Sequence, residues 1–422
     1  MARKLVHGLE GVGHVEGLDE ELSAAFLRLD ERGGVISLPR VDSTGGLFVG
    51  FLDRDADGVP TTLRYHDTKG SYVLGGCRDV GGSVSTLGTG LTRLRAQRVI
   101  AAGDSDVDYV EVDGMASEID GLSNWTGMST VTQTTDFGSW VNLHAENQQS
   151  ILLGGDAEAT VESSFTYNPS PKGNVFGITD LALLRTRTAD LRSWQEHAAV
   201  HHMLQDLMCL VFGKPCLAGI VSVKREDDQP YAADDDDRRL WREVYEPTFG
   251  RSATWIEPLD RAKANPLFRL ADVERRALEE WINNWALWSR PTWIAVTTMF
   301  QRGTTIESHL LQIGVALEAL GYALWTAAGG LGRTPQYLEL LELVTDSVYV
   351  EHPRIYAGQP VEAWRNGFNA AFKGTKHADN PLPTAMAARD FAAQGMNLIR
   401  AWLGTKLGVH DATLAAGFDR RG

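Results

Sequence analysis

The sequence is poor in cysteine, contains no long apolar run and has fewer basic than acidic residues. It has three cysteines, Cys77, Cys209 and Cys216, and no CxxC pair. Three thiols cannot build a disulfide framework, and a zinc site needs four suitable ligands, so we expect free thiols and no metal. No run approaches the 18 apolar residues of a membrane helix, and no apolar segment follows the basic N-terminus Met1–Lys4. These absences predict a cytoplasmic protein with no membrane partner.

The deficit of positive charge limits the partners. The formal net charge is −15 and the pI is near 5.2. A surface that binds nucleic acid over a broad area should be basic, so the negative net charge argues against such a surface. A small basic cleft on an acidic protein remains compatible with this charge. The 422 residues, 43% hydrophobic and 23% charged, are typical of a globular chain of two or three domains.

Glycine and tryptophan divide the chain. Of the 43 glycines, 26 fall in residues 1–180, whereas only two of the 12 tryptophans, Trp125 and Trp140, do. We therefore expect an α+β protein, with a turn-dense β-rich region followed by an all-helical bundle. The predicted boundaries are 1–185 for the β-rich domain, 186–264 for a linking helix and acidic loop, and 265–410 for the helical domain.

Short alternating runs between turn signals predict an antiparallel β-sandwich or distorted barrel in the first region. The expected strands are 46–52, 61–66, 71–74, 93–101, 108–112, 140–144, 159–167 and 174–184. Near Asp190 the period changes, and Asp190 is the expected N-cap of a helix that ends at about Phe212, before Gly213.

From Ala271 onward the apolar spacing predicts four or five helices. Their expected limits are Leu278 to Pro291, where the proline ends the run, Ile306–Leu324, Thr334–Val344 with Pro335 in the first turn, Gln359–Lys373 and Thr384–Leu403. Short connections between them favour antiparallel neighbours in a bundle.

Several ligand-like patterns are better explained as ordinary structure. The turn Asp53–Gly58 begins like a calcium loop, but Arg64 stands where that loop needs a bidentate glutamate. Gly88-Thr89-Gly90 lacks the third glycine of a dinucleotide site. His197 and His201 have helical spacing for a shared metal, but no third ligand is evident, and packing is the favoured interpretation.

One predicted helix carries a polar stripe. Val361, Trp364, Phe368, Ala371 and Phe372 gather on its core face at 100° per residue. The other side carries Arg365, Asn366, Asn369, Lys373, Lys376 and His377, all within about 120°. Each can donate a hydrogen bond to a phosphate oxygen, and the histidine can also transfer a proton. A solvated amphipathic face remains the alternative.

These segments resemble a known family. Ala316-Leu317-Glu318-Ala319-Leu320, Trp364-Arg365-Asn366 and Phe372–Asn380 (FKGTKHADN) resemble HEPN domains. The stretch Ser117–Trp125 (SEIDGLSNW) resembles the N-terminal domain that accompanies HEPN in ApeA-type anti-phage proteins. The resemblance implies a dimeric, metal-independent ribonuclease with an Arg-x(4–6)-His motif, in which the RNA 2′-OH attacks the neighbouring phosphate, His serves as acid or base and Arg steadies the charge.

The sequence departs from that motif. Eleven residues separate Arg365 from His377, and the loose pattern also occurs at Arg192/His197 and Arg302/His309. Either Arg365, Asn366, Lys373 and His377 form a variant catalytic site, or the domain only binds. In the first case, Arg365 and Lys373 are expected to hold phosphate, Asn366 to position it and His377 to transfer the proton.

The resemblance favours an anti-phage ribonuclease regulated by its N-terminal domain. Its expected partners are an RNA substrate, a second copy bound through the helical domain, and a phage or cellular trigger, with no cofactor. The first alternative is a catalytically inactive HEPN module that binds RNA, a nucleotide or a protein. The second is a ligand-binding β domain that the bundle merely dimerises.

Overall fold

The computed structural model describes residues 4–16, 23–41, 61–84, 89–102, 107–136, 140–146, 149–169, 176–228, 240–253 and 255–420. The expected strand 46–52, the turn Asp53–Gly58, Gly88 and the acidic part of the loop 225–239 lie outside these residues. The chain forms two compact units: residues 1–118, 184–201 and 218–250 make the first, and residues 119–183, 202–217 and 251–422 make the second.

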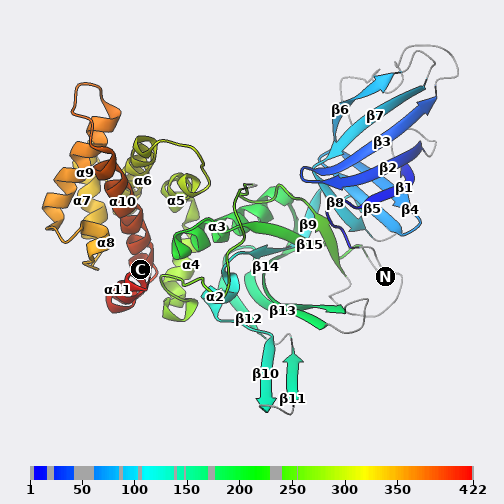
Figure 1. Cartoon of the computed structure of the whole chain (residues 1–422), viewed down its shortest axis with the longest axis horizontal. Coiled ribbons are helices and arrows are strands. Elements are labelled where there is room, and N and C mark those ends of the chain that lie inside the picture. The colour runs from blue at the N-terminus through cyan, green and yellow to red at the C-terminus, as the bar shows by residue number, and fades with distance from the viewer. Residues whose placement is uncertain are drawn as a thin grey trace. The chain divides into compact units, whose positions relative to one another are not determined.

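The first unit is built on an antiparallel sheet (Figure 1, blue to cyan and green). Its strands are β1 (Glu10–Glu16), β2 (Ser23–Asp30), β3 (Gly33–Val41), β4 (Thr62–Asp67), β5 (Gly70–Gly75), β6 (Arg78–Val84), β7 (Thr89–Ala96), β8 (Arg98–Ala102), β9 (Glu111–Ile119), β15 (Ala218–Lys224) and β16 (Trp241–Tyr245). They lie in the order β9-β15-β16-β8-β5-β4-β1-β2-β3-β7-β6. The end of β14 (Phe176–Ser193) and the start of α3 (Trp194–Phe212) complete the unit.

Alternation along each strand decides which face of this sheet is buried. In β2, Ala25, Leu27 and Leu29 are buried, whereas Phe26 and Arg28 between them are exposed. Successive strand residues point to opposite faces, so this pattern places one face on the core and the other in solvent. The buried face joins residues such as Leu27, Leu74, Leu94 and Val99 in one apolar cluster.

The second unit contains a β part and all the later helices. Its strands are β10 (Val131–Asp136) and β11 (Trp140–Ala145), which form a separate hairpin (Figure 1), and β12 (Ser150–Gly154) and β13 (Ala159–Pro169) beside the start of β14. Its helices are α2 (Leu122–Thr126), η2 (Leu270–Asp272), α4 (Arg275–Asn283), α5 (Trp285–Met299), α6 (Ile306–Ala327), α7 (Tyr337–Asp346), α8 (Pro353–Tyr356), α9 (Val361–Lys376), α10 (Ala385–Lys406) and α11 (Asp411–Asp419).

Helix α6 is the centre of the helical bundle. It contacts α5, α7, α9 and α10, and Leu310, Ile313, Leu317 and Leu320 are buried on it. By length and composition α6 could also cross a membrane, and 44% of its most apolar window is buried; core helices and signal sequences pass the same test, so the match is weak evidence. The packing with four neighbours accounts for its apolar sequence.

The predicted order of a β-rich region followed by an all-helical region is confirmed. The helix end at Phe212 is also confirmed, because Gly213 follows it at a φ of 59°, a left-handed conformation that suits glycine. Thr384 caps α10 as its hydroxyl accepts from the Ala387 N–H at 3.2 Å.

Three predicted helix limits are wrong. Strand β14 continues past Asp190 to Ser193, where the Ser193 hydroxyl and the Glu196 carboxylate form a reciprocal cap for α3. Pro291 lies inside α5, and the break falls at Asn284, whose side-chain amide donates to the Glu280 carbonyl at 2.7 Å.

The third wrong limit is the start at Thr334-Pro335. Helix α7 begins later, at Tyr337, because the Gln336 N–H donates to the Glu339 carboxylate at 2.6 Å and so closes its first turn.

The family-like stretch around Trp125 serves the fold of the second unit. Asp120 accepts hydrogen bonds from the N–H groups of Leu217 (3.0 Å) and Leu259 (3.1 Å). Gly121 has a φ of 83°, and a Cβ there would lie 2.3 Å from the Phe212 ring. Trp125 is fully buried. These residues therefore tie distant segments together and do not form a solvent-facing site.

Candidate functional site

Helix α9 exposes four of its six stripe residues as the sequence predicts, whereas Arg365 and Asn369 are half-buried. Trp364 and Phe368 are buried, whereas Asn366, Lys373 and His377 are exposed. The core side is fixed by aromatic contacts, since the Trp364 ring lies 5.1 Å from Phe368 and its indole N–H donates to Gln394 Oε1 at 2.7 Å. A helix held by that face must expose the opposite one.

Arg365 differs from the rest of the stripe because it has acidic partners. Its guanidinium lies 2.9 Å from Glu342 Oε1 and 3.6 Å from Asp346 Oδ1, both on α7. Only 16% of the Arg365 side chain is exposed. Much of the positive charge of Arg365 is therefore neutralised by these two carboxylates. The two acids stand four residues apart, which places them on one face of α7, but the sequence did not reveal which helix that face meets.

Arg365 and His377 stand at opposite ends of α9. The helix runs without interruption to Lys376, and His377 is its C-cap. At 1.5 Å per residue, the two Cα atoms are about 18 Å apart. The helix does not bend at Gly374 to bring them together. Gly374 is helical and packs so closely on Pro381 that a Cβ would lie 2.0 Å from the Pro381 carbonyl oxygen. One copy of the chain therefore does not bring these two side chains together.

The other arginine–histidine pairs do not form sites either. His309 lines a mostly apolar hollow of about 310 Å³ between α5, α6 and α10, and the arginine in its lining is Arg389. Arg302 is exposed and lies outside that lining. His197, the partner proposed for Arg192, is buried in the first unit.

His197 and His201 belong to a buried chain of hydrogen bonds. His197 Nε2 lies 3.1 Å from the Val112 carbonyl and its Nδ1 lies 2.8 Å from the Thr186 hydroxyl. The same hydroxyl lies 3.1 Å from His201 Nε2, and His201 Nδ1 lies 2.6 Å from the Ser117 hydroxyl. All four side chains are at most 1% exposed.

One direction of donation satisfies all of these groups. His197 Nε2–H must donate to the carbonyl, so Nδ1 accepts from Thr186. The Thr186 oxygen then accepts from His201 Nε2–H, and His201 Nδ1 accepts from Ser117. Both imidazoles are neutral in this arrangement. An added proton on His197 Nδ1 would turn the Thr186 hydroxyl towards the more distant Met115 carbonyl, at 3.5 Å, so these bonds favour unprotonated His197. Each ring nitrogen already has a hydrogen-bond partner, and the pair is not a metal site. Within the described residues, no cluster of three His, Cys, Asp or Glu side chains could hold a metal ion.

We expect acid to destabilise the first unit through His197. Burial lowers the pKa of His197 below its ordinary 6.5, and the Val112 carbonyl opposes this only in part. The unfolded chain therefore binds more protons than the folded one below about pH 6.5, and stability falls as pH falls through that window. Urea midpoints measured between about pH 7.5 and 5.5 should decline less steeply in His197→Asn than in the wild type. Equal slopes would contradict this role.

Fold and site together define a two-part protein, a β-rich region followed by a helical bundle with a polar stripe on α9. The family model of ApeA N-terminal domain 1 matches residues 20–285, well over half of the chain, and the chain belongs to this family. The match ends at the first residue of α5 and does not identify an HEPN domain in the helices beyond it. Neither a curated protein nor a solved structure matches the chain.

Proposed function

We propose that this protein is a cytoplasmic anti-phage ribonuclease that cleaves RNA without a metal ion and carries its catalytic groups on α9. The observation that carries the proposal is the exposed stripe of Asn366, Lys373 and His377 beside Arg365. In a chain of net charge −15, such a concentration of donors for phosphate oxygen is unusual. Membership of the ApeA N-terminal domain family supports the defence role.

The proposed roles follow the chemistry of each side chain. Lys373 and Arg365 hold phosphate oxygens, the second through a planar fork of donors. Asn366 positions the phosphate by hydrogen bonding. His377 exchanges the proton between the ribose 2′-OH and the leaving oxygen, a step that an imidazole can perform near neutral pH.

A second copy is needed to complete this site. Because Arg365 and His377 are about 18 Å apart along one straight helix, two copies of α9 packed antiparallel would place Arg365 of one beside His377 of the other. Ala370 lies near the midpoint, is exposed and is small enough for close helix approach. A two-fold axis there generates two identical composite sites. The N-terminal region then acts as the sensor of a phage or cellular trigger that governs this pairing.

One observation favours a second function, a catalytically inactive module that binds RNA, a nucleotide or a protein. Glu342 and Asp346 form ion pairs with Arg365. An arginine whose charge is already paired stabilises the negative charge of a transition state less. If the protein is a ribonuclease, by contrast, these ion pairs lower its activity, because the RNA phosphate must replace the two carboxylates at Arg365.

Cleavage of RNA in EDTA separates these functions. The ribonuclease should cut RNA in EDTA, and Glu342→Gln should accelerate cutting by up to about five-fold, because an exposed ion pair is worth at most about 1 kcal/mol. Glu339→Gln is the matched control, since Glu339 pairs with Arg333 and not with Arg365.

RNA that binds but is never cut, in either variant and with the trigger present, would establish the binding module. Absence of both binding and cutting would overturn both functions.

A further inference from the structure

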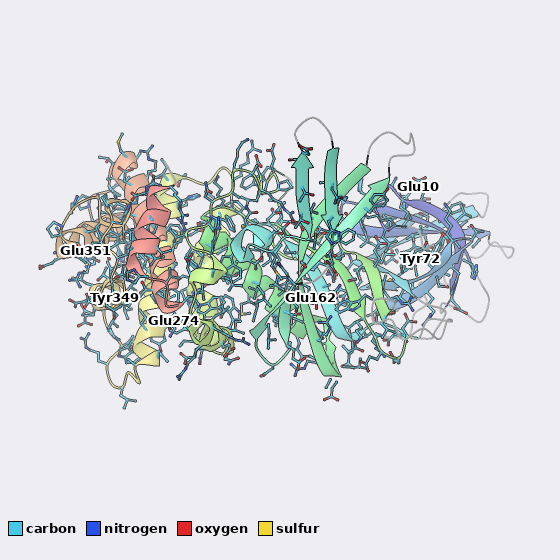
Figure 2. The ribbon with its side chains drawn as sticks, turned by 90° about the horizontal axis from the view of Figure 1, so that it is seen from below. Glu10, Tyr72, Glu162, Glu274, Tyr349 and Glu351 are labelled. Atoms are coloured by element: carbon cyan, nitrogen blue, oxygen red, sulfur yellow. The ribbon has the colours of Figure 1, made fainter. Side chains whose placement is uncertain are left out.

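The solvent face of the first unit's sheet carries two ordered rows of side chains. The strand registers align Val12 with Phe26, Phe26 with Ser37, and Ser37 with Arg93, across β1, β2, β3 and β7. The neighbouring row contains Glu10, Arg28, Val35 and Arg95 in the same strand order. Glu10 projects from this sheet in Figure 2. Adjacent strands are about 4.8 Å apart, so each row spans about 14 Å.

This face is hollowed and exposes apolar groups that water does not favour. Val12 is 67% exposed, Phe26 47% and Val80, on β6, 44%. Together with the two rows they line a hollow of about 700 Å³. That volume lies within the range of small-molecule sites, which are about 300–1,000 Å³. An exposed phenylalanine at the centre of such a hollow offers a flat surface for stacking.

The charges around the hollow favour an anionic ligand that also donates hydrogen bonds. Arg95 donates two bonds to the Asp30 carboxylate, at 2.7 and 3.1 Å, so its charge is neutralised and the charge that attracts an anion comes from Arg28 and Arg93. Arg93 is exposed and forms no ion pair with any residue that the structure describes. Glu10 stands opposite Arg28 in the register and would accept from ribose hydroxyl or base amino groups.

The arrangement of strands argues for a nucleobase and against a peptide strand. A bound peptide adds to a free sheet edge. The hollow is lined by β1, β2, β3 and β7, each of which pairs with a strand on both sides, and the end strand β6 contributes only Val80. The free surface is therefore the face, where one aromatic ring is flanked by arginines. Stacking of a base on an aromatic ring beside cations that hold phosphate is how single strands bind to such faces.

We propose that this face, centred on Phe26 and Arg93, binds a ligand that combines a nucleobase with phosphate, either a nucleotide or single-stranded nucleic acid. The base stacks on Phe26 and Val12, Arg93 and Arg28 hold phosphate, and Glu10 accepts from the sugar or base. This site lies within the first unit and needs neither α9 nor RNA cleavage, so it stands independently of the ribonuclease function.

Binding to the full-length protein tests the site. The probes are a single-stranded DNA and a 2′-O-methyl RNA of about 12 nucleotides, neither of which can be cleaved through a 2′-OH, together with AMP, ATP and a poly-glutamate peptide. Phe26→Ala should weaken oligonucleotide binding at least about five-fold, since one stacked base contributes that much or more. Arg93→Ala should reduce the slope of log affinity against log salt by about 0.7, and Arg93→Lys should restore it.

Lys69→Glu, an exposed charge reversal in the β4–β5 turn, is the matched control and should change nothing. Competition by AMP or ATP identifies a nucleotide site, and binding of the oligonucleotides alone identifies a single-strand site. The proposal fails if neither probe class binds, if the peptide binds as tightly as the oligonucleotides, or if Phe26→Ala and Arg93→Ala retain full affinity with unchanged thermal midpoints.

Discussion

Replacing His377 with alanine is expected to lower RNA cleavage by about 10²–10⁴-fold, the usual contribution of a positioned general acid or base. The imidazole lies at the end of the exposed stripe and has no part in the bundle core. Its backbone N–H donates to the Lys373 carbonyl at 2.8 Å, and alanine keeps that bond. Stability should therefore change by no more than about 0.5 kcal/mol.

Cleavage rate and thermal midpoint should be measured together for this variant. His144→Ala is a suitable control because His144 is also exposed, at 66%, but lies on β11. A wild-type rate in a folded His377→Ala protein would remove His377 from the mechanism. His309, which faces the hollow shared with Arg389, would then be the next histidine to test.

Mixing two inactive variants tests the composite site. In a heterodimer of Arg365→Ala and His377→Ala, one composite site has lost both groups and the other retains both. Random pairing makes half of all dimers mixed, so the mixture should recover about a quarter of wild-type activity if the site spans two copies. No recovery after subunit exchange would exclude the antiparallel arrangement.

The features that sequence alone predicted are local ones. Gly213 after Phe212, Thr384 before α10 and the apolar spacing of α6 each act within a few residues, and the end of α3, the start of α10 and the start of α6 lie within one residue of the predicted positions. The polar stripe of α9 could also be predicted, because a 3.6-residue period separates its core face from its solvent face without reference to any neighbour.

The features that sequence missed depend on neighbours distant in the chain. Glu342 and Asp346 became partners of Arg365 only because α7 packs beside α9. His197 and His201 have metal-like spacing on one helix, yet strands β9 and β14 supply the carbonyl and hydroxyls that they bond. The sequence offered two N-cap candidates for α3, Asp190 and the pair Ser193 and Glu196. Ser193 and Glu196 form the cap because strand β14 continues past Asp190.

Arg400 joins two distant segments of the second unit, and its loss should be the most destabilising single change outside the apolar core. The residue is 4% exposed on α10. Its Nε–H donates to the Leu210 carbonyl at 2.6 Å and its Nη2–H to the Val211 carbonyl at 3.3 Å. Both carbonyls belong to the last turn of α3, where carbonyl groups have no partner within the helix. They lie at the negative end of the helix dipole, which a cation stabilises. The guanidinium also lies 5.5 Å from the Phe418 ring.

Arg400→Met keeps the length and apolar stem of the side chain but removes every donor. Hydrogen bonds from a charged group contribute about 1.5–3 kcal/mol each. We therefore expect Arg400→Met to lower the free energy of unfolding by about 3 kcal/mol. Arg400→Lys should have an intermediate effect, because lysine retains the charge but not the planar fork of donors. Urea midpoints followed by tryptophan fluorescence give the measurement, since Trp402 lies two residues away in the same helix. Arg389→Met, on the exposed side of α10, should change stability by at most about 0.5 kcal/mol. Equal midpoints for the two methionine variants would show that α3 does not depend on Arg400 for its C-terminal end.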